Sequence, residues 1–211
     1  MVTVSAPPIA RQVWGLFAEL LDYPQDSPIE LLRECRTLAT PVSGEAEARL
    51  AGFQSFAEEA TLGRLQEEYT RAFDMDESHS LYLGYHLLGE SYKRSALLLE
   101  FKERYRVHGM EVGGELADHL PVVLRFLALS DDQALTNEIL ADAIWPTLEM
   151  MARSDEKFED AADEDDRPPS DFPPYHELVA ALRQVVEVAK KEWQPLTIIS
   201  ANNGTDPARR R

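Results

Sequence analysis

Apolar residues recur at every third or fourth position along most of this chain, a spacing that places them on one face of a helix. Val13, Phe17 and Leu20 form such a face in the first predicted helix. That helix ends before Pro24, because a residue that precedes proline is pushed out of the α region. The same spacing predicts further helices at about 28–40, 44–60, 62–73, 91–108, 118–129, 133–158 and 174–193. The pattern therefore indicates an all-α protein.

Strand patterns are nearly absent, and strongly polar segments fall late in the chain. Residues 196–199 are the single candidate for a strand, and they stand alone. Residues 154–171 carry nine acidic and two basic side chains together with two prolines, which is typical of a loop. For 211 residues we expect one domain, a helical bundle of about eight to nine helices over residues 1–200. We expect a flexible acidic loop at about 159–172 and a disordered tail at 201–211.

Charge and composition exclude several classes of partner. The chain has 21 basic and 38 acidic residues, a net charge of −17, so its field opposes phosphate backbones and anionic lipids. No apolar stretch approaches the roughly 20 residues of a membrane span, and the N-terminus lacks the basic region of a signal peptide. Cys35 is the only cysteine and is expected in the core, so no internal disulfide can form. We therefore expect a cytoplasmic protein without nucleic acid partners and without direct membrane insertion.

The residues that could carry chemistry gather between positions 69 and 129. Six rings, Tyr69, Phe73, Tyr82, Tyr85, Tyr92 and Tyr105, occur there beside His86, Glu90, Asp118 and His119. Rings with polar tips beside carboxylates suit a groove that takes up an amphipathic peptide, although each ring taken singly fits a core position better. Asp118 also has a structural interpretation, as the N-cap of the helix that contains Pro121. The group as a whole indicates a recognition groove.

Two catalytic interpretations compete with the recognition groove. His86 and Glu90 share a helix face, so with His119 they could form the ligand set of a small metal-dependent hydrolase. Glu115, Asp118 and His119 could act as general acid and base. No nucleophile elbow, phosphate loop or dinucleotide turn accompanies them. We therefore expect no enzyme, no metal centre and no bound cofactor, and we expect His86 to hydrogen-bond a carboxylate or a backbone carbonyl.

Four motifs carry a resemblance to a known family. They are Leu20-Leu-Asp-Tyr-Pro24, Tyr69-x3-Phe73-Asp74, Leu81-Tyr-Leu-x2-His86-x2-Gly89-Glu90 and Glu115-Leu-x-Asp118-His119-Leu-Pro121. Over about residues 11–152 the chain resembles the respiratory nitrate reductase delta-subunit family, the NarJ-type molybdoenzyme assembly chaperones. Leu116 stands where the wider group of maturation proteins has proline, a departure that leaves open which reductase is served.

The resemblance implies a dedicated chaperone that is not part of the finished enzyme. Such a protein binds the N-terminal segment of the apo catalytic (alpha) subunit of nitrate reductase. It holds this client off the membrane anchor and keeps it open until the molybdenum cofactor and an iron–sulfur cluster are inserted. Carried onto this chain, the client-binding positions are Tyr69, Phe73, Leu81, Tyr82, His86, Gly89, Glu90, Asp118, His119 and Pro121, with Glu115 added for a basic client end. The alternative client is a selenate, chlorate or dimethyl-sulfide oxidoreductase. Direct contact with the cofactor and pairing of two copies stay open.

Overall fold

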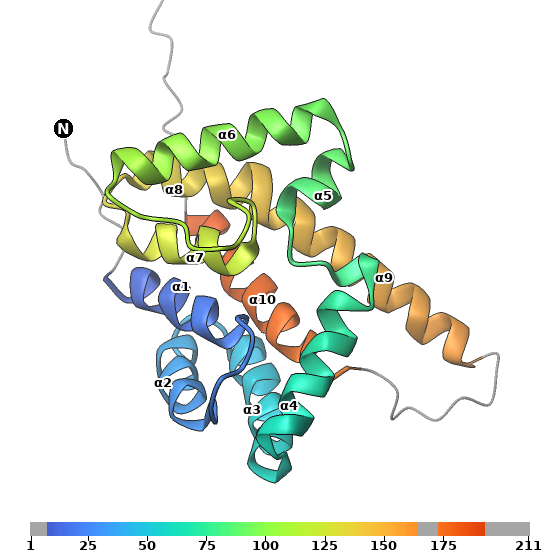
Figure 1. Cartoon of the computed structure of the whole chain (residues 1–211). Coiled ribbons are helices and arrows are strands. Elements are labelled where there is room, and N and C mark those ends of the chain that lie inside the picture. The colour runs from blue at the N-terminus through green and yellow to red at the C-terminus, as the bar shows by residue number, and fades with distance from the viewer. Residues whose placement is uncertain (1–7, 164–172, 193–211) are drawn as a thin grey trace, which may run out of the picture.

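Helices make up most of the described part of the chain, which is residues 8–163 and 173–192 of the computed structural model (Figure 1). The α-helices are α1 (Pro8–Leu20), α2 (Ile29–Ala39), α3 (Gly44–Glu59), α4 (Leu62–Tyr69), α5 (Leu83–Leu88), α6 (Tyr92–Val107), α7 (Leu120–Leu129), α8 (Gln133–Ile139), α9 (Trp145–Asp163) and α10 (His176–Glu192). Two π-helical turns, η1 (Thr70–Asp74) and η3 (Leu140–Ile144), and one 3-10 turn, η2 (Glu77–His79), complete the list. Because η1 continues α4 and η3 joins α8 to α9, the described residues form nine continuous helices. The prediction of an all-α bundle is confirmed.

Two helix pairs form the main interfaces of the bundle. α1 packs against α7, and α10 packs against α3. Phe17 of α1 and Val123 of α7 are completely buried, as are Leu178 and Leu182 of α10. Burying an aliphatic or phenyl side chain of this size contributes about 1.5–3 kcal/mol. These interfaces are therefore a strong source of stability.

Local sequence signals set where several helices begin. The side chains of Ser43, Thr61 and Asp132 each accept a hydrogen bond from the backbone N–H three residues further on, at 3.2, 3.2 and 3.0 Å. An N-cap of this kind contributes about 1 kcal/mol to helix stability. After α6, Gly109 adopts a positive φ of 70°, which a residue with a side chain takes up only with strain. The helix boundaries therefore follow from short-range chemistry.

The long helix predicted at 133–158 changes its winding just before Pro146. Proline has no N–H to donate, and its ring crowds the carbonyl four residues earlier, so the turn η3 widens to the π form. α9 then continues as far as Asp163 and extends beyond the rest of the bundle (Figure 1).

The end of α9 corrects part of the predicted domain organisation. Residues 159–163 were predicted to belong to the acidic loop, yet they are helical. Alanine and glutamate are good helix formers, which favours this extension. The remaining loop positions 164–172, the strand candidate 196–199 and the tail 201–211 lie outside the described residues.

Cys35, the only cysteine of the chain, lies in the core of the bundle. Cys35 is completely buried on α2, so its predicted place in the core is confirmed. Burial raises the pKa of the Cys35 thiol to about 12, which keeps it protonated and unreactive at neutral pH.

In the part of the chain that the structure describes, no helix is long and apolar enough to cross a membrane.

Candidate functional site

Two predicted motifs meet where the chain enters α5 and α7. The Leu120 N–H donates to the Leu81 carbonyl at 2.8 Å, and the Leu83 N–H donates to the Asp118 carbonyl at 2.9 Å. Residues 81–83 and 118–120 therefore run antiparallel at an isolated β-bridge. We call this contact the α5–α7 crossing. It holds the N-terminal ends of the two helices together.

Asp118 lies completely buried at the α5–α7 crossing. Its Oδ2 accepts hydrogen bonds from the Gly84 N–H at 3.1 Å and from Arg94 Nε at 3.0 Å. Its carbonyl accepts from Leu83, so Asp118 satisfies two N–H groups in the first turn of α5. The prediction that Asp118 caps α7 is wrong, since His119 occupies the N-cap position there and makes no side-chain cap bond. The carboxylate turns instead toward the guanidinium charge of Arg94, because hydrogen bonds between charged groups are the stronger ones.

Tyr82 and Glu115 form a more exposed part of the crossing. The Tyr82 hydroxyl donates to Glu115 Oε2 at 2.9 Å, and the Arg94 guanidinium lies 5.7 Å from the centre of the Tyr82 ring. Burial, together with the hydrogen bond to Glu115, raises the pKa of Tyr82 to about 12, so the phenol stays a donor at neutral pH. Glu115 and Glu90 are the predicted site carboxylates that are exposed to solvent.

His86 has a backbone partner. Its Nε2 lies 2.6 Å from the Ser80 carbonyl oxygen, so this nitrogen carries the proton and donates it. Burial lowers the pKa of His86, which favours the neutral ring. The expected hydrogen bond to a carbonyl is confirmed. Among the described side chains, His86, Glu90 and His119 are not brought together as a metal-ligating group.

Six of the predicted client-binding residues are buried. They are Tyr69, Phe73, Leu81, Asp118, His119 and Pro121. The Tyr69 ring lies edge-on to Phe73 and to Tyr175, with centroids 5.0 and 5.4 Å apart. Tyr82, His86 and Gly89 are half-buried. A client contacts buried side chains only if the bundle opens, so the client-binding role of these six stays a prediction.

The burial of His119 predicts lower stability at mildly acidic pH. Burial lowers the pKa of His119, although the nearby Glu115 carboxylate acts in the opposite direction. Unfolding exposes a histidine with a pKa near 6.5, so below about that pH the unfolded chain binds a proton more readily than the folded chain. The stabilisation is complete above about pH 6.5 and is lost as the pH falls toward the lowered value. His119→Gln should therefore flatten the fall in unfolding free energy between about pH 6.5 and 5, measured by urea denaturation.

The matched control is His108→Gln. His108 is exposed, so its replacement removes a histidine without removing a buried imidazole, and the two variants are compared in the same urea denaturation experiment. A His119→Gln protein whose stability falls with pH as steeply as that of the wild type would contradict the prediction.

An apolar groove lies between α5, α6 and the continuous α8–η3 helix, whose arrangement can be followed in Figure 1. Its volume is about 290 Å³, and it is lined by Leu87, Leu88, Leu97, Glu100, Phe101, Arg104, Glu138, Ile139, Asp142 and Ala143. Arg104 is the one base in this lining, and it hydrogen-bonds to Glu100 at 2.6 Å and to Glu138 at 3.3 Å. We call this feature the α5–α6 groove.

The α5–α6 groove was not predicted from the sequence, although α6 carries a signal for it. Three successive leucines at 97–99 point to different sides of the helix, so one neighbouring surface cannot bury all of them. Leu97 lines the groove, whereas Leu99, which is 68% exposed, lies outside its lining. An apolar position such as Leu97 that the bundle covers only in part is available to a partner.

Four further polar side chains that were not predicted as a site meet where η2, α9 and α10 contact. They are Asp76, His79, Asp155 and His176, and we call them the histidine–carboxylate cluster. Asp76 and His79 are local neighbours, but Asp155 and His176 come from distant segments. No sequence spacing could therefore have shown that the four lie together.

Comparison with known proteins places these features in a family. The family model described as nitrate reductase delta subunit matches residues 40–144. The chain is 31% identical over 125 residues to NarW of Escherichia coli (strain K12), described as a probable nitrate reductase molybdenum cofactor assembly chaperone, a match covering 58% of this chain and 52% of NarW. It is 38% identical over 64 residues to the assembly chaperone NarJ of the same strain, covering 30% of this chain and 27% of NarJ. The matched stretches thus span about half the length of one relative and about a quarter of the other.

A solved structure shares the fold. A crystal structure of a candidate redox enzyme maturation protein from Archaeoglobus fulgidus superposes with a TM-score of 0.55 and covers 84% of this chain and 93% of that chain. Its sequence identity of 20% makes this a likeness of fold alone. The family match includes both segments of the α5–α7 crossing and both sides of the α5–α6 groove. The chain belongs to the nitrate reductase delta subunit family.

Proposed function

We propose that this protein is an assembly chaperone, not an enzyme, and that its client is the catalytic subunit of a nitrate reductase. It binds the N-terminal segment of the apo subunit and keeps that subunit open and away from its membrane anchor while the molybdenum cofactor and an iron–sulfur cluster are inserted. The names of NarW and NarJ as molybdenum cofactor assembly chaperones support the client class. The α5–α6 groove is the observation that supports binding of a peptide.

The chemistry of the α5–α6 groove fits an amphipathic helix with basic residues. Leucines from α5 and α6 and the Phe101 ring offer an apolar surface to the apolar face of such a helix. Glu100, Glu138 and Asp142 add three carboxylates, against the single guanidinium of Arg104. The net charge of −17 attracts the same basic segment over a longer range. The groove therefore favours a cationic, apolar-faced client over an acidic one.

The residues predicted from the family motifs take a supporting role in this proposal. Asp118 fixes the start of α5 through Gly84, and α5 provides Leu87 and Leu88 of the groove. Glu90 and Glu115 are exposed and can meet basic client residues that extend beyond the groove. In this proposal the residues named in the family motifs position the helices of the groove, and they are not among its lining residues.

Peptide binding tests the proposal. Calorimetry with a peptide of about 20 residues from the N-terminus of the catalytic subunit, enough for about 30 Å of helix, should give a dissociation constant that rises with salt. Leu97→Asn should weaken binding at least about tenfold, since truncation of a central interface residue commonly costs more than about 1.4 kcal/mol.

Leu99→Asn provides the matched control on the same helix. Leu99 is 68% exposed and does not line the groove, so this substitution should change the affinity by less than about twofold. A lack of heat with the nitrate reductase peptide, or equal losses in the two variants, would contradict the proposal. Peptides from selenate, chlorate and dimethyl-sulfide oxidoreductases test the alternative clients.

A further inference from the structure

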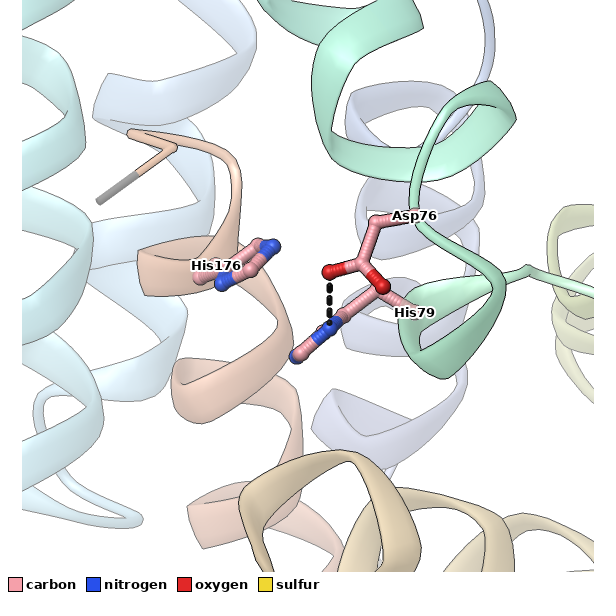
Figure 2. A group of neighbouring side chains, drawn as sticks. All are labelled: Asp76, His79 and His176. Carbon is pink, nitrogen blue, oxygen red and sulfur yellow. Dashed lines mark hydrogen bonds and ion pairs between the residues drawn. The ribbon is translucent and has the colours of Figure 1, made fainter. Parts of the chain in front are cut away.

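The histidine–carboxylate cluster joins three segments that are distant in sequence. Figure 2 shows Asp76 and His79 on one short turn and His176 on the first turn of α10, with the three side chains turned toward one another. The two imidazole rings are stacked, with centroids 3.7 Å apart and planes at 15°. His79 is 1% exposed and His176 is 4% exposed, whereas the side chain of Asp76 is 37% exposed. The cluster is therefore mostly buried but has one side open to solvent.

Asp155 lies within ion-pair distance of both histidine rings. Its Oδ1 lies 3.0 Å from His79 Nε2 and 3.0 Å from His176 Nδ1. A carboxylate in this position is the usual support of histidines that bind a metal.

Asp76, His79 and His176 are close enough to share one ion. Ligand atoms of Asp76, His79 and His176 all lie within 4.8 Å of one another, and His79 Nδ1 is 3.0 Å from Asp76 Oδ2. Tetrahedral ligands at about 2.0–2.2 Å from zinc lie about 3.5 Å apart. The widest pair must therefore approach by about 1 Å, while the His79–Asp76 pair at 3.0 Å must move slightly apart. Parallel rings direct their lone pairs side by side, so one ring must also turn about χ2. Such a rotation leaves the backbone in place.

We propose that Asp76, His79 and His176 bind one divalent transition metal ion, with Asp155 as the residue that positions both imidazoles. Two imidazole nitrogens and one carboxylate oxygen suit Zn²⁺ and Fe²⁺, whereas Mg²⁺ and Ca²⁺ prefer oxygen ligands alone. The ion links η2, which leads into α5, to the first turn of α10. This site is built from different residues than the α5–α6 groove, so it is independent of the client-binding proposal.

Metal titration of the full-length protein tests this site. After chelator treatment, Zn²⁺ is expected to bind at one ion per chain in calorimetry and to raise the thermal unfolding midpoint. Co²⁺ serves as the spectroscopic probe, with visible d–d bands expected on binding. Asp76→Asn and His79→Gln should each abolish the one-ion stoichiometry, and Asp155→Asn should weaken binding by about 10–100-fold.

Two variants make the result of the metal titration interpretable. His108→Gln replaces an exposed histidine outside the cluster and should leave Zn²⁺ binding unchanged. Asp76 is partly exposed, so Asp76→Asn reports on the site even if the buried His79→Gln variant does not fold. Failure of both Zn²⁺ and Co²⁺ to bind stoichiometrically would overturn the proposal. Binding that persists unchanged in Asp76→Asn would also overturn it, because the ion would then be held by other groups.

Discussion

Replacing Gly84 by alanine should lower the free energy of unfolding by about 3 kcal/mol, measured by urea denaturation followed by circular dichroism. An added Cβ would stand 2.6 Å from Asp118 Oδ2 and 3.0 Å from Arg94 Cγ, so a neighbour must shift. Asp118 cannot shift at low cost, because its carboxylate is buried and bonded to Gly84 and Arg94. Overpacking alone costs about 1–3 kcal/mol, and a weakened hydrogen bond to a buried charge adds to it.

Gly52→Ala is the matched control for this substitution. Gly52 lies within α3, is exposed, and has no atom within 4 Å of where a Cβ would stand. Alanine there should raise the unfolding free energy by about 0.5–1 kcal/mol, because glycine loses more backbone freedom on folding. If the two variants change stability alike, the close approach at Gly84 does not constrain the fold.

Removing the Asp118 side chain should be the most destabilising single change at the α5–α7 crossing. Asp118→Ala leaves the Arg94 guanidinium, whose side chain is 17% exposed, and the Gly84 N–H without their acceptor. Breaking a buried ion pair by deleting one partner costs about 3–5 kcal/mol, so we expect a loss in that range in the same denaturation experiment. The Gly84 N–H should lose protection from hydrogen exchange at the same time, since it then lacks its acceptor, whereas the Leu83 N–H keeps the Asp118 backbone carbonyl.

An exposed ion pair supplies the contrast. Glu103→Ala removes the partner of Arg106 on the surface of α6, where the two side chains are 60% and 72% exposed, and should change the unfolding free energy far less than Asp118→Ala does. Combining Asp118→Ala with Arg94→Met should cost less than the two single losses added together, because no buried charge then stays unpaired. Strict additivity would show that the two side chains are not coupled.

Most helix positions could be predicted because they depend on neighbours three and four residues away. The last helix was predicted at 174–193 and is observed at His176–Glu192, and the first was predicted to end before Pro24 and ends at Leu20. The prediction failed at 159–163, where helix-forming residues continue α9 into a segment whose composition is typical of a loop. Composition describes an average over the segment, whereas helix propagation depends on each residue in turn.

The candidate site was harder to predict because one residue type serves two purposes. A tyrosine followed four positions later by phenylalanine suits a binding groove and a core equally well, and Tyr69 and Phe73 are in the core. His86 could be interpreted from chemistry alone, since a half-buried imidazole needs a partner, and it has the Ser80 carbonyl. Asp118 was assigned to the wrong helix, because its strongest partners lie on α5 and α6 and not in its own local sequence.

The amino-acid sequence by itself determined the helical class, the acidic charge and the segments in which the family motifs occur. These properties depend on composition and on contacts within a few residues. Only the tertiary structure decided that 81–83 crosses 118–120, that α5, α6 and the α8–η3 helix enclose an apolar groove, and that Asp155 meets His79 and His176. These contacts join residues far apart in the chain, and they form only when the burial of many apolar side chains outweighs the conformational entropy lost by bringing the segments together.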